Sequence, residues 1–269
     1  MGEIALFTWN LHGKADAHDL ALGHLLRSCA KETIVACLQE LPGKSSIAFA
    51  RRKGNGTKLG ASLRVVESNP LVRGLALVHH EDLRLDRVLV DPDKEFLAAE
   101  FILPSSTKRL GVVGLHAKSK SDMRRAEEHG GSRALLRHAI SALQLNCDHL
   151  VVLGDFNSPF GAQEIQSWHC FYALAPGSEA VSADTRGGYA HKALHTVPPE
   201  NAPALGTFRW SDSGSTKYET IDFIAVDAAT RTGASSKIMT SIQSRSLLDL
   251  KTSKPTPSDH LPVSGTINI

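Results

Sequence analysis

The sequence has little net charge, few cysteines and no apolar run long enough to span a membrane. Its 30 Lys and Arg residues against 28 Asp and Glu leave a formal charge of +2, which is too small to indicate a nucleic-acid protein by itself. The cysteines show no CxxC spacing and lie among apolar or helical residues, so we expect reduced, buried thiols rather than disulfides or a zinc site: Cys29, Cys37, Cys147 and Cys170.

Repeats, low-complexity tracts and Pro/Gly/Ser-rich linkers are also missing from the 269 residues. A chain of this length approaches the size at which one hydrophobic core stops growing, so residues 1–269 are expected to form one large domain. The sequence enters Ile4-Ala5-Leu6-Phe7 at once, without the basic and apolar regions of a signal peptide. Together with the lack of a membrane-spanning run, this predicts a cytoplasmic protein with no membrane partner.

What the sequence does contain is a set of short apolar runs that end abruptly in polar residues. The clearest is Leu150–Leu153, which is followed by Gly154, Asp155 and, two residues later, Asn157. Four consecutive apolar residues are typical of a strand covered on both faces. Functional groups collect where such strands end, so Asp155 and Asn157 are candidate site residues. The alternative is a turn in which both side chains bond their own backbone.

The first forty residues repeat this arrangement twice. Glu3–Trp9 predicts a strand that ends at Asn10, and Thr33–Leu38 predicts a second strand that ends at Glu40. Residues 15–30 between them carry apolar side chains at the spacing of an amphipathic helix. Strand, helix and strand in this order indicate a layered α/β core.

The rest of the chain predicts further strands with polar ends. Five short apolar runs between residues 61 and 115 predict antiparallel meanders, and the last of them ends at His116. Asp122–Leu145 predicts a long helix, and Gly177–Pro203 an irregular loop. Further strands are expected at Thr207–Trp210, Thr220–Val226, Ile238–Ser244 and Leu261–Ile269, and with them come Asp222, Asp259 and His260.

The polar strand ends together suggest one kind of chemistry. Oxygen donors such as Asn10, Glu40 and Asp259 suit a hard divalent cation, magnesium or manganese, whereas zinc would favour more histidine or thiolate. An acid beside a histidine can orient the imidazole and stabilise its cation. A metal that bears charge and a His/Asp pair that moves protons fit attack of water on a phosphate ester. Each residue taken singly could instead be a cap or turn residue.

These motifs, in this order, resemble the endonuclease/exonuclease/phosphatase superfamily, which includes pancreatic-type deoxyribonucleases, abasic-site endonucleases, tyrosyl-DNA phosphodiesterases, inositol-phosphate 5-phosphatases and neutral sphingomyelinases. The resemblance runs from Thr8 to His260 through Trp9-Asn10, Leu38-Gln39-Glu40, Leu115-His116, Gly154-Asp155-Phe156-Asn157, Ile221-Asp222 and Ser258-Asp259-His260. It implies an α/β fold, a four-layer α/β sandwich with two central mixed β-sheets flanked by helices, and a site at one edge.

The resemblance also implies how the metal would be held. Glu40 would be the principal magnesium ligand, with manganese as an alternative ion. Asn10 and Asp259 would complete the metal environment directly or through water.

The remaining residues would handle water and phosphate. Asp155 would position or deprotonate the attacking water, Asn157 would hold a phosphate oxygen, and His116 would contact the scissile phosphate. Asp222 would orient His260, which would bind or protonate the phosphoryl group. Which of Asp155 and His260 is the base stays open at this point.

Two basic stretches favour nucleic acid as the partner. Lys44–Arg64 carries six basic residues and no acid, and Lys118–Arg137 carries six basic residues against three acids. Either could be an ordinary solvated face, but beside such a site they predict sequence-independent phosphate contacts. We therefore expect a Mg2+-dependent phosphodiesterase that hydrolyses nucleic acid, with DNA as the leading substrate.

Three alternatives stay open at the level of sequence. One is a soluble enzyme acting on a small phosphoester, such as an inositol phosphate or a phospholipid head group. Another is a repair enzyme similar to the tyrosyl-DNA phosphodiesterases, whose four motifs look like those of this chain. The third is a non-catalytic module that has kept the fold, although loss of a metal ligand or of the Asp/His pair would mark such a module, and neither is missing.

Overall fold

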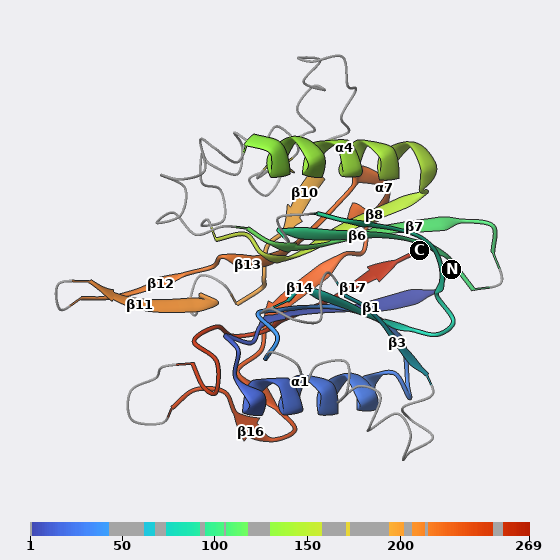
Figure 1. Cartoon of the computed structure of the whole chain (residues 1–269). Coiled ribbons are helices and arrows are strands. Elements are labelled where there is room, and N and C mark those ends of the chain that lie inside the picture. Colours follow the sequence, from blue (N-terminus) through green and yellow to red (C-terminus); the bar gives the residue numbers. More distant parts are fainter. Residues whose placement is uncertain are drawn as a thin grey trace.

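Two β-sheets are stacked between helices, so the molecule has four layers (Figure 1). In this computed structural model, the described residues are 2–42, 62–67, 74–91, 95–104, 106–117, 130–157, 171–172, 194–201, 206–212, 215–249 and 255–269. The expected α/β sandwich with two central mixed sheets is confirmed.

The first sheet contains both ends of the described chain. Its strand order is β14 (Ser235–Ile238), β17 (Val263–Asn268), β1 (Glu3–Asn10), β2 (Thr33–Gln39), β4 (Ala76–His80) and β3 (Leu63–Glu67). Strands β1 and β2 are parallel, whereas β17 runs antiparallel to β1. Helix α1 (Ala15–Ser28) connects β1 to β2 and covers the outer face of this sheet (Figure 1). The predicted strand, helix and strand are therefore present.

The second sheet carries the apolar run that ends at Asp155. Its strand order is β5 (Arg84–Val90), β6 (Phe96–Ile102), β7 (Arg109–His116), β8 (His149–Asp155), β13 (Asp222–Val226), β10 (Leu194–Val197) and β9 (Phe171–Tyr172). Strands β5, β6 and β7 form the expected antiparallel meander, and β7 is parallel to β8. Helices α4 (Gly130–Asn146) and α7 (Ala228–Arg231) lie on its outer side (Figure 1).

The apolar residues of β8 alternate between two cores. Val151 and Leu153 belong to the large core that includes both sheets and α1. Leu150 and Val152 belong to the smaller core beneath α4, where they pack with residues such as Ile140. All seven residues of β8 are buried, because each face of the strand is covered by a different layer. This explains the unbroken apolar sequence and fixes the strand firmly up to its polar end.

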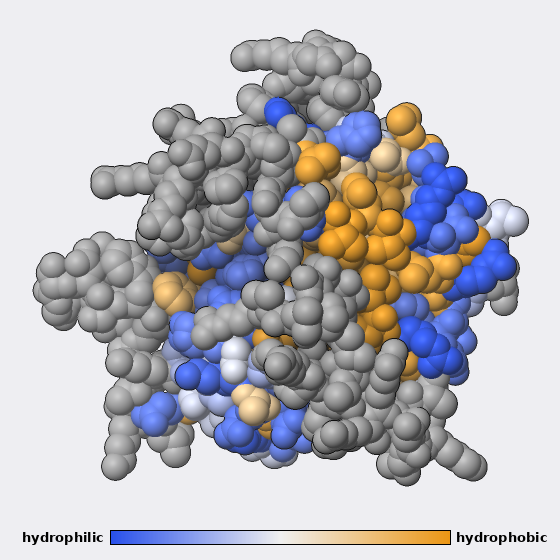
Figure 2. Space-filling model, in the orientation of Figure 1, coloured by the Kyte–Doolittle hydropathy of each residue, from blue (hydrophilic) through white to orange (hydrophobic). Residues whose placement is uncertain are grey.

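The outer edge of the second sheet is much less covered. Every residue of β5 is exposed, including its large apolar side chains: Leu85, Val88, Leu89 and Val90. A broad apolar area is visible on the face of the molecule drawn in Figure 2. The burial that stabilises this sheet is therefore concentrated in its central strands.

Several predicted boundaries are wrong, and several strands were not expected, β9 among them. The predicted strand Ile238–Ser244 is instead the end of β14 and a tight hairpin, β15 (Ser241–Ile242) with β16 (Arg245–Ser246). Strand β10 lies inside the predicted loop Gly177–Pro203. A ribbon of β11 (Phe208–Asp212) and β12 (Ser215–Glu219) projects from the sandwich, and the polar sequence of β12 gave no strand pattern (Figure 1).

Some expectations fall outside the described residues. These include residues 122–129 of the predicted helix, residues 177–193 of the predicted loop and Cys170. Cys29 and Cys37 are buried and Cys147 is half-buried, and these three thiols form no disulfide within the described part of the chain. Within the described part of the chain, no helix combines the length and the apolar character needed to cross a membrane.

Candidate active site

The parallel pair β1 and β2 delivers Asn10 and Glu40 side by side. Asn10 is the last residue of β1 and pairs with Gln39, so Glu40 follows immediately beyond the sheet. Asn10 Nδ2 donates to Glu40 Oε1 at 3.2 Å and to Asp155 Oδ2 at 2.9 Å. The Asn10 amide thus links the end of the first sheet to the end of the second.

The second parallel pair, β7 and β8, places His116 beside Asp155. The two residues are register partners at the ends of their strands. His116 Nε2 lies 4.0 Å from Asp155 Oδ2 and 3.6 Å from Glu40 Oε1. Gly154, just before Asp155, has φ +152°, and a Cβ at this position would lie 1.9 Å from the Leu115 carbonyl oxygen. A side chain at position 154 would therefore force β7 and β8 apart next to the site.

Asp155 is held by neighbours on both of its oxygens. Oδ2 accepts from Asn10, and Oδ1 accepts from the backbone N–H of Asn157 at 2.8 Å. The Asn157 side chain donates through Nδ2 to the Ala117 carbonyl at 2.5 Å. Because Asp155 is only 1% exposed, these contacts fix its carboxylate in one orientation.

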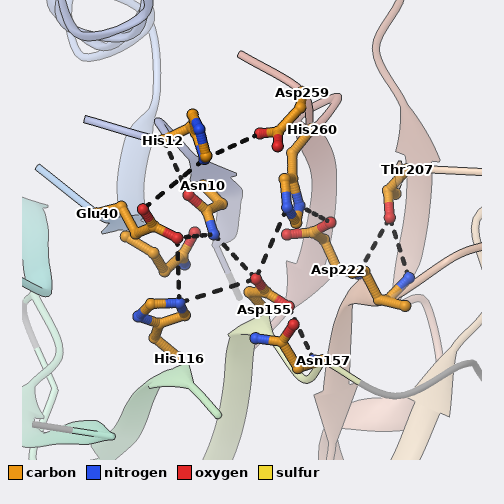
Figure 3. A network of polar contacts seen from close by, with 12 residues as sticks. Asn10, His12, Glu40, His116, Asp155, Asn157, Thr207, Asp222, Asp259 and His260 are labelled. Carbon is orange, nitrogen blue, oxygen red and sulfur yellow. Dashed lines mark hydrogen bonds and ion pairs between the residues drawn. The ribbon is translucent and has the colours of Figure 1, made fainter. Parts of the chain in front are cut away.

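His260 and Asp222 form a buried pair next to Asp155. His260 Nδ1 lies 2.8 Å from Asp222 Oδ2, and His260 Nε2 lies 4.0 Å from Asp155 Oδ2. Figure 3 shows the imidazole between the two carboxylates. Asp222 therefore fixes the ring orientation that turns Nε2 toward Asp155.

The backbone around His260 is anchored to β1. Trp9 Nε1 donates to the His260 carbonyl at 2.9 Å, and Ser258 Oγ donates to the Asn10 carbonyl at 2.6 Å. The Phe208 ring packs against the imidazole with a centroid separation of 4.8 Å. The two hydrogen bonds join residues about 250 positions apart, so the site is assembled by tertiary structure.

Thr207 holds the start of β13 in place. Its Oγ1 accepts the backbone N–H groups of Ile221 and Asp222 at 3.0 and 3.1 Å (Figure 3). Thr207 is fully buried, so no water is available to replace its hydroxyl. No sequence pattern indicates this role, because a threonine 15 residues before Asp222 forms no local motif with it.

The buried charges shift the pKa values of two site residues. Burial, together with the charge of Asp222, raises the pKa of Asp155 to about 6. Burial lowers the pKa of His260, but the facing Asp222 charge and its hydrogen bond, helped by Asp155 and Asp259, outweigh burial and raise it to about 10. At neutral pH His260 is therefore a cation between two carboxylates.

The oxygen donors suited to a metal lie on the more open side of this cluster. The Glu40 and Asp259 side chains are 18% and 42% exposed. The Asn10 amide lies beside Glu40, to which its Nδ2 donates, while its Oδ1 accepts the His12 N–H. Two carboxylates and an amide oxygen fit a hard divalent cation. Among the described residues, one tighter group of potential ligands consists of Asp155, Asp222 and His260, with ligand atoms within 4.8 Å of one another. Since Asp222 and His260 already bond each other there, the Glu40 side is the better place for an ion.

His12 is a site neighbour that sequence reasoning missed. Its Nδ1 lies 3.4 Å from Asp259 Oδ1 and 3.9 Å from Glu40 Oε2. The signal available in the sequence was its position two residues after Asn10, inside the polar end of the first strand.

The structure brings the eight predicted site residues to one end of the sandwich: Asn10, Glu40, His116, Asp155, Asn157, Asp222, Asp259 and His260. The two basic stretches lie only partly within the described residues. Most of Lys44–Arg64 and the first half of Lys118–Arg137 fall outside the described residues, and Arg64 pairs with Glu81 at 2.8 Å.

Several different proteins of known structure have the same fold as this chain. TDP2 of D. rerio complexed with a single-stranded DNA product is 13% identical, with a TM-score of 0.62 over 99% of each chain. The AP endonuclease LMAP of Leishmania major is 14% identical, with a TM-score of 0.60 over 100% of this chain and 88% of that one. The endonuclease domain of the retrotransposon TRAS1 is 13% identical, with a TM-score of 0.59 over 99% of each chain. At such identity these matches establish the fold alone.

Comparison of sequences, unlike these structural matches, identifies the family of the chain. No curated protein sequence matches the chain. The model of the Endonuclease/Exonuclease/phosphatase family, however, matches residues 7–260, which include every residue of the site described above. The chain therefore belongs to the endonuclease/exonuclease/phosphatase family of hydrolases.

Proposed function

We propose that this protein is a divalent-metal-dependent phosphodiesterase that cleaves nucleic acid, with DNA as the leading substrate. One observation carries the proposal: a buried Asp222–His260 pair is aimed at Asp155, beside the metal-compatible donors of Glu40 and Asn10. The site draws on residues from Asn10 to His260, which also supports the expectation that residues 1–269 form one catalytic domain.

Glu40, Asp259 and Asn10 would hold the metal, magnesium or manganese. When bound, the ion supplies positive charge that stabilises a phosphate as negative charge develops on it. Both carboxylates are partly exposed, so an ion and a phosphate could reach them. The chain's own residues would orient the water and move its proton.

Asp155 would take the proton from the attacking water. With its pKa raised to about 6 by burial and by Asp222, the carboxylate is ionised at neutral pH yet basic enough to accept a proton. His260 is unsuited to this task, because its pKa is raised to about 10 against the effect of burial by the Asp222 charge, and its imidazole is already protonated. We therefore favour Asp155 over His260 as the base.

His260 would act as a cationic donor to the phosphate. Its Nδ1 is bonded to Asp222, whereas its Nε2 is turned toward Asp155. The Nε2–H group can therefore donate to a phosphate oxygen that lies between His260 and Asp155. His116 Nε2 reaches the same Asp155 oxygen from the other side, at the same distance of 4.0 Å. The Asn157 amide has a second N–H besides the one given to Ala117, and it would also donate to phosphate.

Two considerations favour nucleic acid over a small phosphoester. The basic residues of Lys44–Arg64 and Lys118–Arg137 would supply phosphate contacts along a strand. A TDP2 structure of the same fold holds a single-stranded DNA product. Binding through such contacts should weaken steeply as salt is raised, and a flat salt response would contradict this part of the proposal.

The decisive assay uses supercoiled plasmid and a linear single strand, each with Mg2+, with Mn2+ or with chelator. We expect cleavage that stops in chelator and falls about 100-fold or more in Glu40→Gln and Asp155→Asn. The exposed residue Asp16, in the first turn of α1, provides the matched control, and Asp16→Asn should cleave normally. Cleavage that survives both chelator and Asp155→Asn would overturn the proposal.

A repair enzyme resembling tyrosyl-DNA phosphodiesterases is the second candidate. It is favoured by TDP2 structures that match 99% of this chain, one of them with a DNA product. An oligonucleotide with a 5′-phosphotyrosine tests it: release of tyrosine without internal cuts would select this activity. Phosphate release from inositol phosphates, with neither DNA substrate attacked, would instead select a small-phosphoester enzyme.

A further inference from the structure

His12 lies between the two carboxylates that are suited to a metal. Its Nδ1 is 3.4 Å from Asp259 Oδ1 and 3.9 Å from Glu40 Oε2, and Figure 3 shows the imidazole beside both. Asp259 and Glu40 are far apart in the sequence, and the His12 side chain contacts both of them. Any cation bound by these two carboxylates would therefore meet an imidazole nitrogen.

The backbone holds His12 in this place by several bonds. His12 has φ +48°, a conformation that histidine adopts more readily than most residues, and its N–H donates to Asn10 Oδ1 at 2.9 Å. The next residue, Gly13, donates its N–H to the Glu40 carbonyl at 2.8 Å. The turn that carries His12 is thus tied both to the predicted ligand Asn10 and to the residue that carries the Glu40 carboxylate.

The distances suit shared coordination better than a simple ion pair. Donor atoms around one ion of this size lie about 3 Å apart when adjacent and about 4.2 Å apart when opposite. Both separations from His12 Nδ1 lie between these two values and exceed the length of about 2.7–2.9 Å of a well-formed charged hydrogen bond, so the three side chains leave room for an ion and need to move little to bind it. The side chain is 41% exposed, so an ion can reach it from solvent.

We propose that His12 Nδ1 is a nitrogen ligand of the divalent ion and that it shifts the preference of the site from Mg2+ toward Mn2+. This inference rests on the proposed function, because it uses the same metal site. Mg2+ favours all-oxygen ligands and holds its waters firmly, whereas imidazole binds transition ions more readily. One imidazole among oxygen donors retains the hard character that suits Mn2+ rather than zinc.

The test measures metal binding directly, without substrate. Titration calorimetry with Mg2+ alone and Mn2+ alone gives the two Kd values, and pulsed EPR of the Mn2+-loaded protein detects a coordinated 14N. We compare wild type with His12→Asn, which keeps a residue tolerant of positive φ. His116→Asn removes the other imidazole near Glu40, and His80→Asn removes a remote histidine whose Nδ1 lies 3.4 Å from Asp82 Oδ2.

We expect 14N coupling in wild type, His116→Asn and His80→Asn, and its loss in His12→Asn. The Kd for Mn2+ should rise at least about tenfold in His12→Asn while the Kd for Mg2+ changes much less. Mn2+ that binds through Glu40 without 14N coupling, or coupling lost in His116→Asn instead, overturns this inference and leaves the proposed function standing. No binding of either ion, or binding unaffected by Glu40→Gln, overturns both.

Discussion

Asp155 and Asp222 lie directly opposite each other in the antiparallel pairing of β8 with β13, and each side chain is at most 1% exposed. Two buried carboxylates at neighbouring positions repel each other, and the charge of Asp222 adds to burial in raising the pKa of Asp155. His260 relieves this repulsion, with Nδ1 2.8 Å from Asp222 and Nε2 4.0 Å from Asp155. The charge of Asp222 consequently raises the pKa values of both Asp155 and His260.

Removing the Asp222 charge should return His260 to an ordinary or low pKa. Burial lowers the pKa of this imidazole, and the Asp222 charge is the strongest influence that raises it to about 10. In Asp222→Asn we expect a pKa at or below the usual 6.5, read from imidazole NMR shifts in metal-free protein, and a rate about 10²–10⁴-fold lower. Asp227→Asn, next to other histidines, should leave His260 unchanged. A His260 pKa near 10 in Asp222→Asn would contradict the assignment.

Asp155 should make the metal-free protein less stable as the pH rises. Its folded pKa is raised by burial and Asp222 to about 6, above the usual 3.8, so the folded state binds more protons than the unfolded state between these values. The contribution of Asp155 to stability is thus lost as the pH rises from about 4 to about 6, and this contribution is constant above that range.

The variant Asp155→Asn removes this loss. Relative to wild type, its free energy of unfolding should therefore increase across the same window by on the order of 2–3 kcal/mol. Urea unfolding in chelator at a series of pH values measures the difference. Asp16→Asn should show no such slope, and a pH-independent difference for Asp155→Asn would refute the raised pKa.

Thr207 should be required for both stability and activity. Thr207→Val keeps the shape but leaves the N–H groups of Ile221 and Asp222 buried without their acceptor. We expect a loss of about 2–3 kcal/mol in the free energy of unfolding, because each unpaired buried donor costs about 1–3 kcal/mol. Thr207→Ser keeps the hydroxyl and should restore most of the stability and rate. Equal behaviour of the two variants would show that the hydroxyl is unimportant.

Gly154→Ala should disrupt the pairing of β7 with β8. The added Cβ would lie 1.9 Å from the Leu115 carbonyl oxygen, and φ +152° is unfavourable for alanine. We expect a loss of at least about 3 kcal/mol in denaturant unfolding, together with a loss of activity as His116 and Asp155 separate. Gly2 has no atom within 4 Å of an added Cβ, so Gly2→Ala is the control. Wild-type stability in Gly154→Ala would contradict the close approach of the strands.

Much of the site could be predicted because apolar runs stop at polar residues. The ends of parallel strands meet at one edge, so the runs before Asn10 and Glu40, and those before His116 and Asp155, place these residues in neighbouring pairs. The buried character of β8 was likewise visible in its four consecutive apolar residues. The local sequence pattern was sufficient to predict a strand such as β8, which is buried on both faces.

The supporting contacts could not be predicted in this way. Thr207 acts on backbone N–H groups 14 and 15 residues away, and Trp9 acts on a carbonyl 251 residues away. Strand β12 pairs with β11 in a two-stranded ribbon that is separate from the two large sheets, and its polar sequence lacks the alternation of a half-buried strand. Such features depend on tertiary contacts between residues that are far apart in the sequence, and no local sequence pattern predicts these contacts.

The bond from Trp9 to the His260 carbonyl has a consequence for synthesis. β1 lies between β2, which comes soon after it in the sequence, and β17, which comes long after it. The Asp222–His260 pair forms only when the segment just before β17 has been synthesised. A nascent chain can bury β1 against β2 and α1, but it cannot complete the proton-handling residues until His260 has left the ribosome. Assembly of the reactive centre therefore waits for the segment that carries His260, and chains that stop before this segment lack the Asp222–His260 pair.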